Sequence, residues 1–514
     1  MNMSQISENS RRIARNTLAL YFRMFLLMAV GLFTARIVLN ALGVEDRGVY
    51  EAVGSIVSMM SIITSSLSTA ISRFLTVEIG RGDADRLDKV FATAVAIMMM
   101  VSAAVLLIAE PLGIWYIRNI MNLPEGRTGA ALWVFQFSLL TFITGLLSVP
   151  YNAAIIAHER MSAFAVIGVV EGLCKLAVAL LMLYVNADKL IFYALLMFAV
   201  AAFVRVLYTV YCRHFFPESR TKASPDKECF RQMAGFAGWN GLSYGVYIVN
   251  TQGVTLLINY FFGVVFNTMR GIAFNVENMV KQFVSNVLTA MNPQITKSYV
   301  SEQRDYAYTL ACKGSKYAFL IIFTLTLPFI FEAETILRLW LGRIVPDGTA
   351  LFTKLALAGL CMDMTLTPFA TLIQASGRIR RFYMVTSAVT LLIFPLIWLL
   401  FLAGAPAYVS YIVFIMVYMV NDVVKLLIIR KETGFPLRMF ARESLLPVLP
   451  VTLISVAVSW LVWRVSGDGL PWALAVIAAG LLAVAVSSFI FALSRGEREY
   501  VISMLPWRGK RGKV

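Results

Sequence analysis

Long apolar stretches recur along the whole chain, and they constrain its fold more than any other feature. A helix that crosses a bilayer needs about 20 mostly apolar residues. The chain holds fourteen such stretches, at residues 16–42, 48–72, 88–110, 128–156, 161–185, 189–213, 231–262, 264–294, 309–331, 349–376, 380–403, 406–429, 444–466 and 470–494. They lack the alternating pattern of barrel strands. The sequence therefore predicts an all-α polytopic membrane protein.

Composition supports a membrane protein and excludes several other classes. Of the 514 residues, 59% are hydrophobic and 14% are charged, whereas a soluble domain has roughly 25% charged residues. So few charges could not cover a soluble surface of this size. The five cysteines form no CxxC pair, so we expect no disulfide framework and no metal site.

The basic residues predict how the chain is oriented. Lys and Arg number 45 against 29 Asp and Glu, which gives a net charge of +16. With the N-terminus in the cytoplasm, about 30 basic residues fall on cytoplasmic segments. Seven fall on the other side, namely Arg47, Arg118, Arg127, Lys189, Arg338, Arg343 and Arg464. This asymmetry predicts that both termini are cytoplasmic, and it explains the charge without a nucleic-acid partner.

Similar residues recur after about 220 positions, which indicates an internal repeat. At a shift of 220, Gly43-Val44 matches Gly263-Val264, and at a shift of 218, Arg160 matches Arg378. Six stretches separate the copies, so both copies have the same orientation and form a parallel repeat. We expect an N-lobe of six helices at 1–214, a cytoplasmic linker at 215–230, a C-lobe of six helices at 231–430, and two last helices with a basic cytoplasmic tail at 431–514.

The stretch 264–294 carries three charged residues on one helix face. Arg270, Glu277 and Lys281 lie within about 20° of one line along a helix. A charge at the bilayer centre costs roughly 2.5–3.5 kcal/mol, so it is normally paired or functional. Glu277 and Lys281 could form an i,i+4 pair that joins a neighbouring helix. Alternatively, the row forms a cavity wall with Arg270 as an additional cation.

Further basic residues within the stretches suggest a cationic lumen. They are Arg23, Lys175 and Arg205, of which Lys175 can pair with Glu171 one turn away. With Arg270 and Lys281, these side chains would favour an anionic substrate. Arg binds phosphate bidentately, so a pyrophosphate headgroup fits such a lumen.

Other polar residues suggest sugar contacts and ion coupling. Asn240, Tyr244 and Tyr247 share one stripe of the stretch 231–262, where they suit either sugar groups or hydrogen bonds between helices. Asp363 has no partner nearby in the sequence, which makes it and Glu277 candidates for coupling to H⁺ or Na⁺. We expect no cofactor.

Motifs for covalent chemistry are missing from the sequence. There is no GxxxxGK[ST] phosphate loop, and Asp83-Ala84-Asp85 lies in a short loop without a nucleotide-binding domain. No Ser/His/Asp combination is visible. We therefore expect a protein that is not an enzyme.

Several sequence stretches carry a resemblance to a known family. They are LNALGVEDRGVYEAVGSIVSM at 39–59, SRFLTVEIGRGD at 72–83, VPYNAAIIAHERM at 149–161, GWNGLSYG at 238–245, RGIAFNVENMV at 270–280 and NPQITKSY at 292–299. The chain resembles the Wzx-type polysaccharide flippases, which serve O-antigen and lipopolysaccharide biosynthesis. These flippases belong to the multidrug/oligosaccharidyl-lipid/polysaccharide exporter superfamily.

The resemblance implies a flippase for undecaprenyl-pyrophosphate-linked oligosaccharide repeat units in the bacterial inner membrane, working by alternating access in surface polysaccharide biosynthesis. In that family the glycan passes through a cationic lumen and the lipid tail enters beside two helices, which correspond here to those of Arg23 and Arg270. Drug exporters of the superfamily use acidic residues in their early helices. The stretch 16–42 instead carries two Arg and no acid.

Two alternatives remain open at this stage. The first is a flippase for the peptidoglycan precursor lipid II, and the second is an integral-membrane polysaccharide polymerase or glycosyltransferase. The expected partners are the lipid-linked anionic glycan, membrane lipids and other polysaccharide-assembly proteins. We expect the protein itself to be a monomer.

Overall fold

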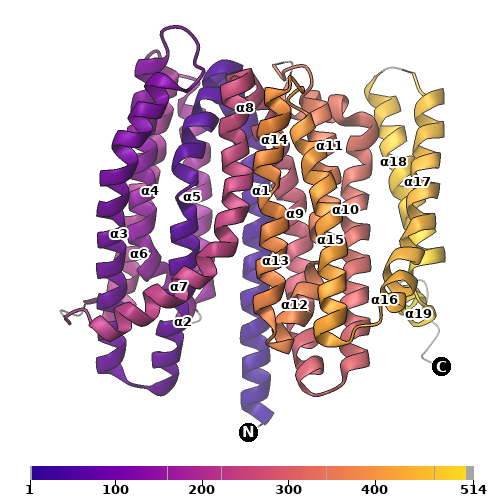
Figure 1. Ribbon diagram of the computed structural model, residues 1–514, viewed down its shortest axis with the longest axis horizontal. Coiled ribbons are helices and arrows are strands. Elements are labelled where there is room, and N and C mark those ends of the chain that lie inside the picture. Colours follow the sequence, from indigo (N-terminus) through magenta and orange to yellow (C-terminus); the bar gives the residue numbers. More distant parts are fainter. Residues whose placement is uncertain (1–2, 159, 221–222, 343, 468, 505–514) are drawn as a thin grey trace. The chain divides into compact units, whose positions relative to one another are not determined.

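The computed structural model describes residues 3–158, 160–220, 223–342, 344–467 and 469–504. These residues form helices joined by short loops, with no strand among them. The first helices are α1 (Met3–Ser58), α2 (Ser61–Arg81), α3 (Ala84–Asn119), α4 (Thr128–Ala157), α5 (Met161–Leu181), α6 (Lys189–Phe215), η1 (Pro217–Arg220), α7 (Lys227–Ile248), η2 (Val249–Gly253), α8 (Val254–Phe262) and α9 (Val264–Val300), as Figure 1 shows.

The remaining helices continue to the C-terminal end of the described chain. They are α10 (Arg304–Leu341), α11 (Thr349–Thr365), α12 (Thr367–Ser376), α13 (Ile379–Leu391), α14 (Ile393–Leu402), α15 (Val409–Thr433), α16 (Leu437–Phe440), η3 (Ala441–Leu445), α17 (Leu446–Val465), α18 (Leu470–Ser487), η4 (Ser488–Ala492) and α19 (Arg495–Met504).

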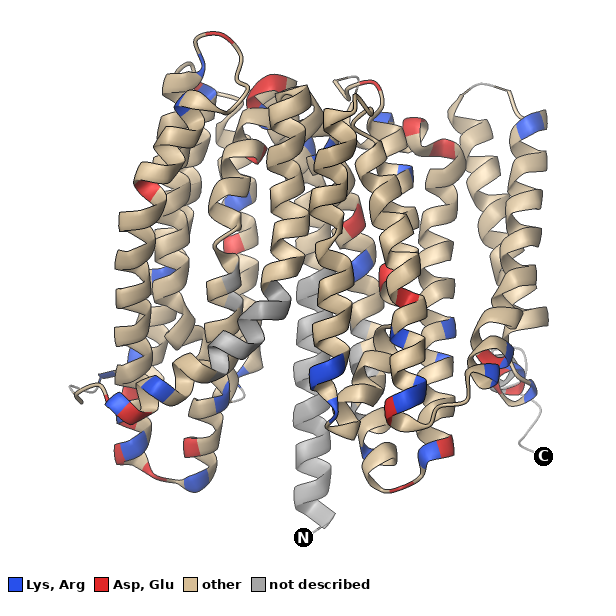
Figure 2. Cartoon of the chain, in the orientation of Figure 1, with Lys and Arg blue, Asp and Glu red and all other residues tan. Residues whose placement is uncertain are grey.

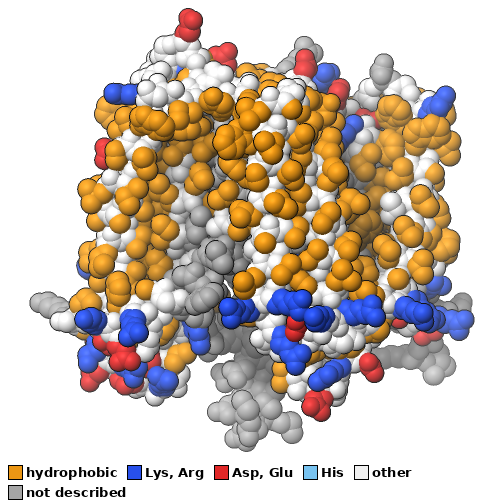
Figure 3. Space-filling view, viewed as in Figure 1, with side chains coloured by type: hydrophobic (Ala, Val, Ile, Leu, Met, Phe, Trp, Pro, Cys, Tyr) orange, Lys and Arg blue, Asp and Glu red, His pale blue; other side chains and the backbone are white. Residues whose placement is uncertain are grey.

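The helices confirm the predicted class of membrane protein. Eleven helical stretches in the described chain are long and apolar enough to cross a membrane. All fourteen predicted stretches are helical over most of their length. The three predicted stretches that are not among these eleven spans are more polar, and they lie in α2, in α7 with α8, and in α9. Polar helices of this kind normally face protein or water. In Figure 3, hydrophobic side chains cover the flanks of the helices, while Lys and Arg gather near helix ends.

The second predicted helix differs in detail from the structure. It was expected at residues 48–72, but it consists of the last part of α1, after a kink at Gly43, followed by α2. Gly43 has φ 80° and ψ 177°, a conformation that is essentially restricted to glycine. The kink directly follows residue 42, where the first predicted helix ends. The break between Ser58 and Ser61 was not predicted, because the apolar stretch continues across it.

Backbone conformation supports the predicted repeat. Gly263 has φ 84° and ψ −174°, which nearly equals the conformation of Gly43, its counterpart in the first copy. Arg378 has φ −91° and ψ 51°, close to the −83° and 55° of its counterpart Arg160. Corresponding helices therefore begin after the same backbone turns in both copies.

The chain packs into two compact units. Unit 1 comprises residues 1–271 and 340–346, and unit 2 comprises 272–339 and 347–514. Helix α7 belongs to unit 1 because it packs against α2 and α3. Residues 340–346 belong to it as well, and the indole of Trp340 donates to the carbonyl oxygen of Leu32 at 2.8 Å. The lobe boundaries expected from the repeat remain a prediction.

Each unit has its own apolar core. In unit 1 the core runs through α1 to α6 and includes residues of α7 and α9, and Phe135 is fully buried in it. In unit 2, Phe369 packs edge to face against Phe435 with ring centroids 5.0 Å apart.

Candidate functional site

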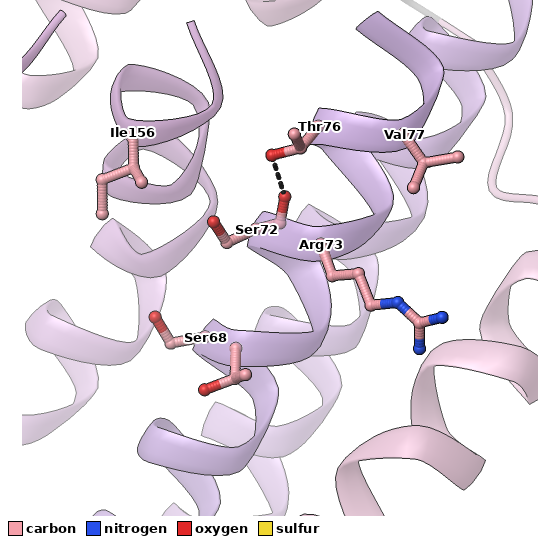
Figure 4. A pocket seen from close by; sticks show the side chains of 7 residues that line it. Ser68, Ser72, Arg73, Thr76, Val77 and Ile156 are labelled. Carbon is pink, nitrogen blue, oxygen red and sulfur yellow. Dashed lines mark hydrogen bonds between the residues drawn. The ribbon is translucent and has the colours of Figure 1, made fainter. Parts of the chain in front are cut away.

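A pocket of about 510 Å³ lies along α2 in unit 1. It is lined by Ser68, Thr69, Ser72, Arg73, Thr76, Val77 and Ile156. Ser68, Ser72 and Thr76 follow one another at four-residue intervals, so their hydroxyls share one helix face. Figure 4 shows these hydroxyls on the side of Ile156, whereas Arg73 extends from the other side of α2.

The pocket places hydroxyl groups and one guanidinium group along the same helix. Thr76 Oγ1 donates to the Ser72 carbonyl at 2.7 Å, which leaves its lone pairs able to accept from a sugar hydroxyl. Arg73 is exposed, and its guanidinium can bind phosphate oxygens. Arg73 was not among the residues predicted from the sequence, and it lies just beyond the predicted helix 48–72. The sequence feature that indicates this pocket is the run of Ser and Thr in SSLSTAISRFLT at residues 65–76.

Arg270 is held inside unit 1 and is only 7% exposed. Its Nε donates to Thr255 Oγ1 at 3.0 Å, and its Nη2 donates to the Thr251 carbonyl at 3.1 Å. Both partners belong to the bend formed by η2 and α8. The structure thus gives Arg270 a fixed orientation, while its predicted role toward substrate remains a prediction.

The start of α9 crosses the last part of α1 at very short range. A Cβ atom on Gly48 would lie 2.0 Å from the carbonyl oxygen of Val264. Glu51 packs against Gly271, where a Cβ atom would lie 3.0 Å from the Glu51 carboxyl carbon. Glu51 also forms an ion pair with Arg47. Absence of a side chain at Gly48 and Gly271 is what allows this approach.

The other predicted cations of unit 1 have different surroundings. Lys175 forms the predicted pair with Glu171, at 2.6 Å between Nζ and Oε1. Arg205 lies 5.9 Å from the centre of the Tyr151 ring. Its Nη1 is buried and has no hydrogen-bond partner among the described residues. The lumen role expected for these two side chains remains a prediction.

The side chains of Arg23, Asn240 and Tyr244 lie outside the described part of the structure. Tyr247 is described and is 40% exposed. The proposed sugar contacts and the proposed lumen role of Arg23 therefore remain predictions.

Unit 2 contains a cluster of four charged side chains on three helices. Lys281 on α9 and Asp363 on α11 lie 3.2 Å apart, between Nζ and Oδ2. Lys425 and Asp422, both on α15, lie 2.9 Å apart. Asp363 thus has a partner that its sequence neighbours did not reveal, 82 residues away. Figure 2 shows charged residues at mid-height in this group of helices.

Within the described residues, no group of His, Cys, Asp or Glu side chains could hold a metal ion. Glu277 lies one turn before Lys281 on α9, and its role in ion coupling remains a prediction.

Comparison with known proteins now places the chain. The model of the polysaccharide biosynthesis protein family matches residues 13–299, more than half of the chain. The chain belongs to this family. EpsK, an uncharacterized membrane protein of Bacillus subtilis (strain 168), is 24% identical over 155 residues. That match covers 30% of each chain, so it spans less than a third of EpsK.

Solved transporter structures share the fold of this family member. A structure of the lipid II flippase MurJ in an inward closed conformation matches with a TM-score of 0.66 and 12% identity, covering 93% of this chain and 98% of MurJ. An inward-facing multidrug transporter of the MATE family and MOP superfamily matches with a TM-score of 0.53 and 11% identity, covering 94% and 96%. At such identities the similarity concerns the fold alone.

Proposed function

We propose that the protein is a flippase for undecaprenyl-pyrophosphate-linked oligosaccharide repeat units. It would act in the bacterial inner membrane during surface polysaccharide biosynthesis, by alternating access and without covalent chemistry. The observation that carries this proposal is the family match over residues 13–299. A fold shared with MurJ supports transport of a lipid-linked glycan over its polymerisation.

The polar groups of the helices fit such a substrate. Arg73 and the hydroxyl row on α2 offer phosphate and sugar contacts on one helix. Arg270 and Lys281 add cations along α9. Within each unit these cations would attract the headgroup, while the apolar helix flanks leave the lipid tail in the bilayer.

Orientation and partners form part of the same proposal. The bias of Lys and Arg favours cytoplasmic termini. Other polysaccharide-assembly proteins would supply the substrate and consume the product, and the protein would act as a monomer. The cycle would be coupled to H⁺ or Na⁺ through Asp363 and Glu277.

A lipid II flippase is the second candidate. It is favoured by the match to MurJ over 93% of this chain. Both candidate substrates carry a pyrophosphate, so the cations described above serve either one. The two candidates differ only in the glycan that the hydroxyl row would contact.

A reconstitution assay tests the proposal and separates the two candidates. Purified protein is placed in liposomes that contain either a fluorescent undecaprenyl-pyrophosphate-linked repeat unit or fluorescent lipid II. A membrane-impermeant quencher then reports how much lipid has crossed. If the protein speeds crossing of the repeat unit, the result supports the proposal. If the protein speeds crossing of lipid II only, the second candidate is the function instead. Appearance of longer glycans would instead identify a polymerase.

A further inference from the structure

The charged cluster of unit 2 lies near mid-depth of its helices. Asp363 is close to the middle of the 28-residue span Thr349–Ser376, and Asp422 is close to the middle of the 25-residue span Val409–Thr433. Lys281 reaches Asp363 from α9, and Lys425 lies one turn from Asp422 on α15. The cluster therefore belongs to the interior of the membrane rather than to its surface.

The four charges balance within the cluster. Two ammonium groups face two carboxylates, and Asp363 interacts electrostatically with Lys425 and Asp422 as well as with Lys281. Within these four residues the net charge is zero while Lys281 lies beside Asp363. If Lys281 leaves, Asp363, Asp422 and Lys425 carry one uncompensated negative charge, which is unfavourable away from water.

Lys281 is better suited to leave its partner than Arg270. A lysine has a flexible four-carbon stem and three rotatable donors. The Lys281 and Asp363 side chains are 27% and 29% exposed, so neither is completely enclosed by protein. Arg270 is instead buried and held by two hydrogen bonds to the bend at η2 and α8.

We propose that Asp363 holds Lys281 as an internal counter-ion, that an anionic headgroup draws Lys281 away, and that the freed carboxylate takes up one monovalent cation. The inference rests on the proposed function for the identity of the anion. It assigns Asp363 a second role, which is to restrain Lys281 when no substrate is bound.

Replacement of Lys281 by a cation at Asp363 makes the binding of the anion and of the cation cooperative. The cation binds Asp363 only after Lys281 has left, and Lys281 leaves more readily when a cation can replace it. Each ligand must therefore increase the affinity for the other by the same factor. This linkage would couple an ion gradient to substrate binding without a preformed ion site.

Binding of inorganic pyrophosphate to the purified full-length protein tests the proposal. Asp363→Asn removes the restraint on Lys281, so we expect pyrophosphate to bind about tenfold more tightly. Na⁺ should increase the affinity of the wild-type protein and not that of Asp363→Asn. Lys281→Gln should weaken pyrophosphate binding, and the double variant should resemble Lys281→Gln.

Glu171→Gln is the matched control. It releases Lys175 from an ion pair of the same kind in unit 1, so it should leave the linkage to Na⁺ intact. If Na⁺ has no effect on the wild-type protein, proton uptake on pyrophosphate binding, measured calorimetrically in buffers of different ionisation enthalpy, identifies the cation as H⁺.

The inference is overturned if Asp363→Asn binds pyrophosphate with wild-type affinity. It is equally overturned if neither Na⁺ nor proton uptake accompanies binding to the wild-type protein. Size-exclusion profiles of the single and double variants show whether each has folded. Failure of the wild-type protein to move lipid-linked glycans, with the linkage present, would overturn the proposed function alone.

Discussion

The hydroxyl of Thr268 donates a hydrogen bond to the carbonyl oxygen of Val44 at 2.6 Å. The reciprocal contact is between Gly48 and the carbonyl oxygen of Val264. Val264 and Thr268 are the repeat counterparts of Val44 and Gly48, so the two copies meet each other through equivalent positions. Glu51 and Gly271, which are also counterparts, lie against each other at the same crossing. The repeat thus appears in the packing as well as in the sequence.

Gly48→Ala should destabilise the protein at this crossing. The added Cβ atom would lie 2.0 Å from a backbone oxygen, which cannot move as a flexible side chain would. Overpacking of this kind costs about 1–3 kcal/mol, so the apparent melting temperature in detergent should fall. Gly54→Ala is the control, because nothing lies within 4 Å of its added Cβ atom. Equal melting of the two variants would contradict the close approach.

Gly263→Ala should destabilise the turn between α8 and α9. Gly263 has φ 84° and ψ −174°, and a residue with a side chain in that region costs about 1–3 kcal/mol. Gly43→Ala should have a similar effect, because Gly43 has nearly the same backbone angles. Gly31→Ala, within α1 and without a neighbour inside 4 Å, should melt like the wild-type protein. Thermal unfolding in detergent measures all three.

Arg73→Ala should reduce transport of the lipid-linked substrate. Loss of a hydrogen bond to a charged group costs about 1.5–3 kcal/mol, which corresponds to a reduction of about tenfold or more at low substrate concentration. Arg73→Lys should retain part of the activity, since it keeps the charge but not the bidentate geometry. Arg118→Ala, at an exposed position near the end of α3, should transport normally. Normal transport by Arg73→Ala would remove the α2 pocket from the substrate path.

Glu497→Gln should release α19 from α10. Glu497 Oε1 accepts from Lys313 Nζ at 2.7 Å, and Lys316 Nζ lies 3.5 Å from its other oxygen. Burial opposes ionisation of Glu497, but hydrogen bonds from Lys313 and from the Ser494 amide lower its pKa to about 2. Protease cleavage between α18 and α19 at pH 7 should be faster in Glu497→Gln than in the wild-type protein. Glu499→Gln, at an exposed position, is the control.

The pH dependence of this docking follows from the lowered pKa. A carboxylate whose pKa is lower in the docked state contributes fully above its ordinary value of 4.5 and loses its contribution as the pH falls through about 2. The difference in cleavage between wild type and Glu497→Gln, followed with pepsin at acidic pH, should therefore shrink between pH 4.5 and 2. A difference that stays constant over this range would show that ionised Glu497 does not hold α19.

The all-α membrane fold could be predicted from sequence because it depends on a local property. Hydrophobicity over about 20 residues decides whether a helix can span a bilayer, and this holds whatever the helix packs against. The match between Gly43 and Gly263 could also be found in the sequence, because it depends on local backbone conformation. A turn that only glycine can adopt leaves a glycine in both copies.

Partnerships between distant residues depended on the tertiary structure. Nothing in the sequence around Asp363 indicates Lys281, because helix packing brings them together across 82 positions. The exposure of Arg73 and the close contact at Gly48 likewise depend on neighbouring helices. The sequence by itself determined which segments enter the membrane and that charges accompany them. Only the packed structure decided which charges neutralise each other, since that depends on distances of a few ångströms between side chains from different helices.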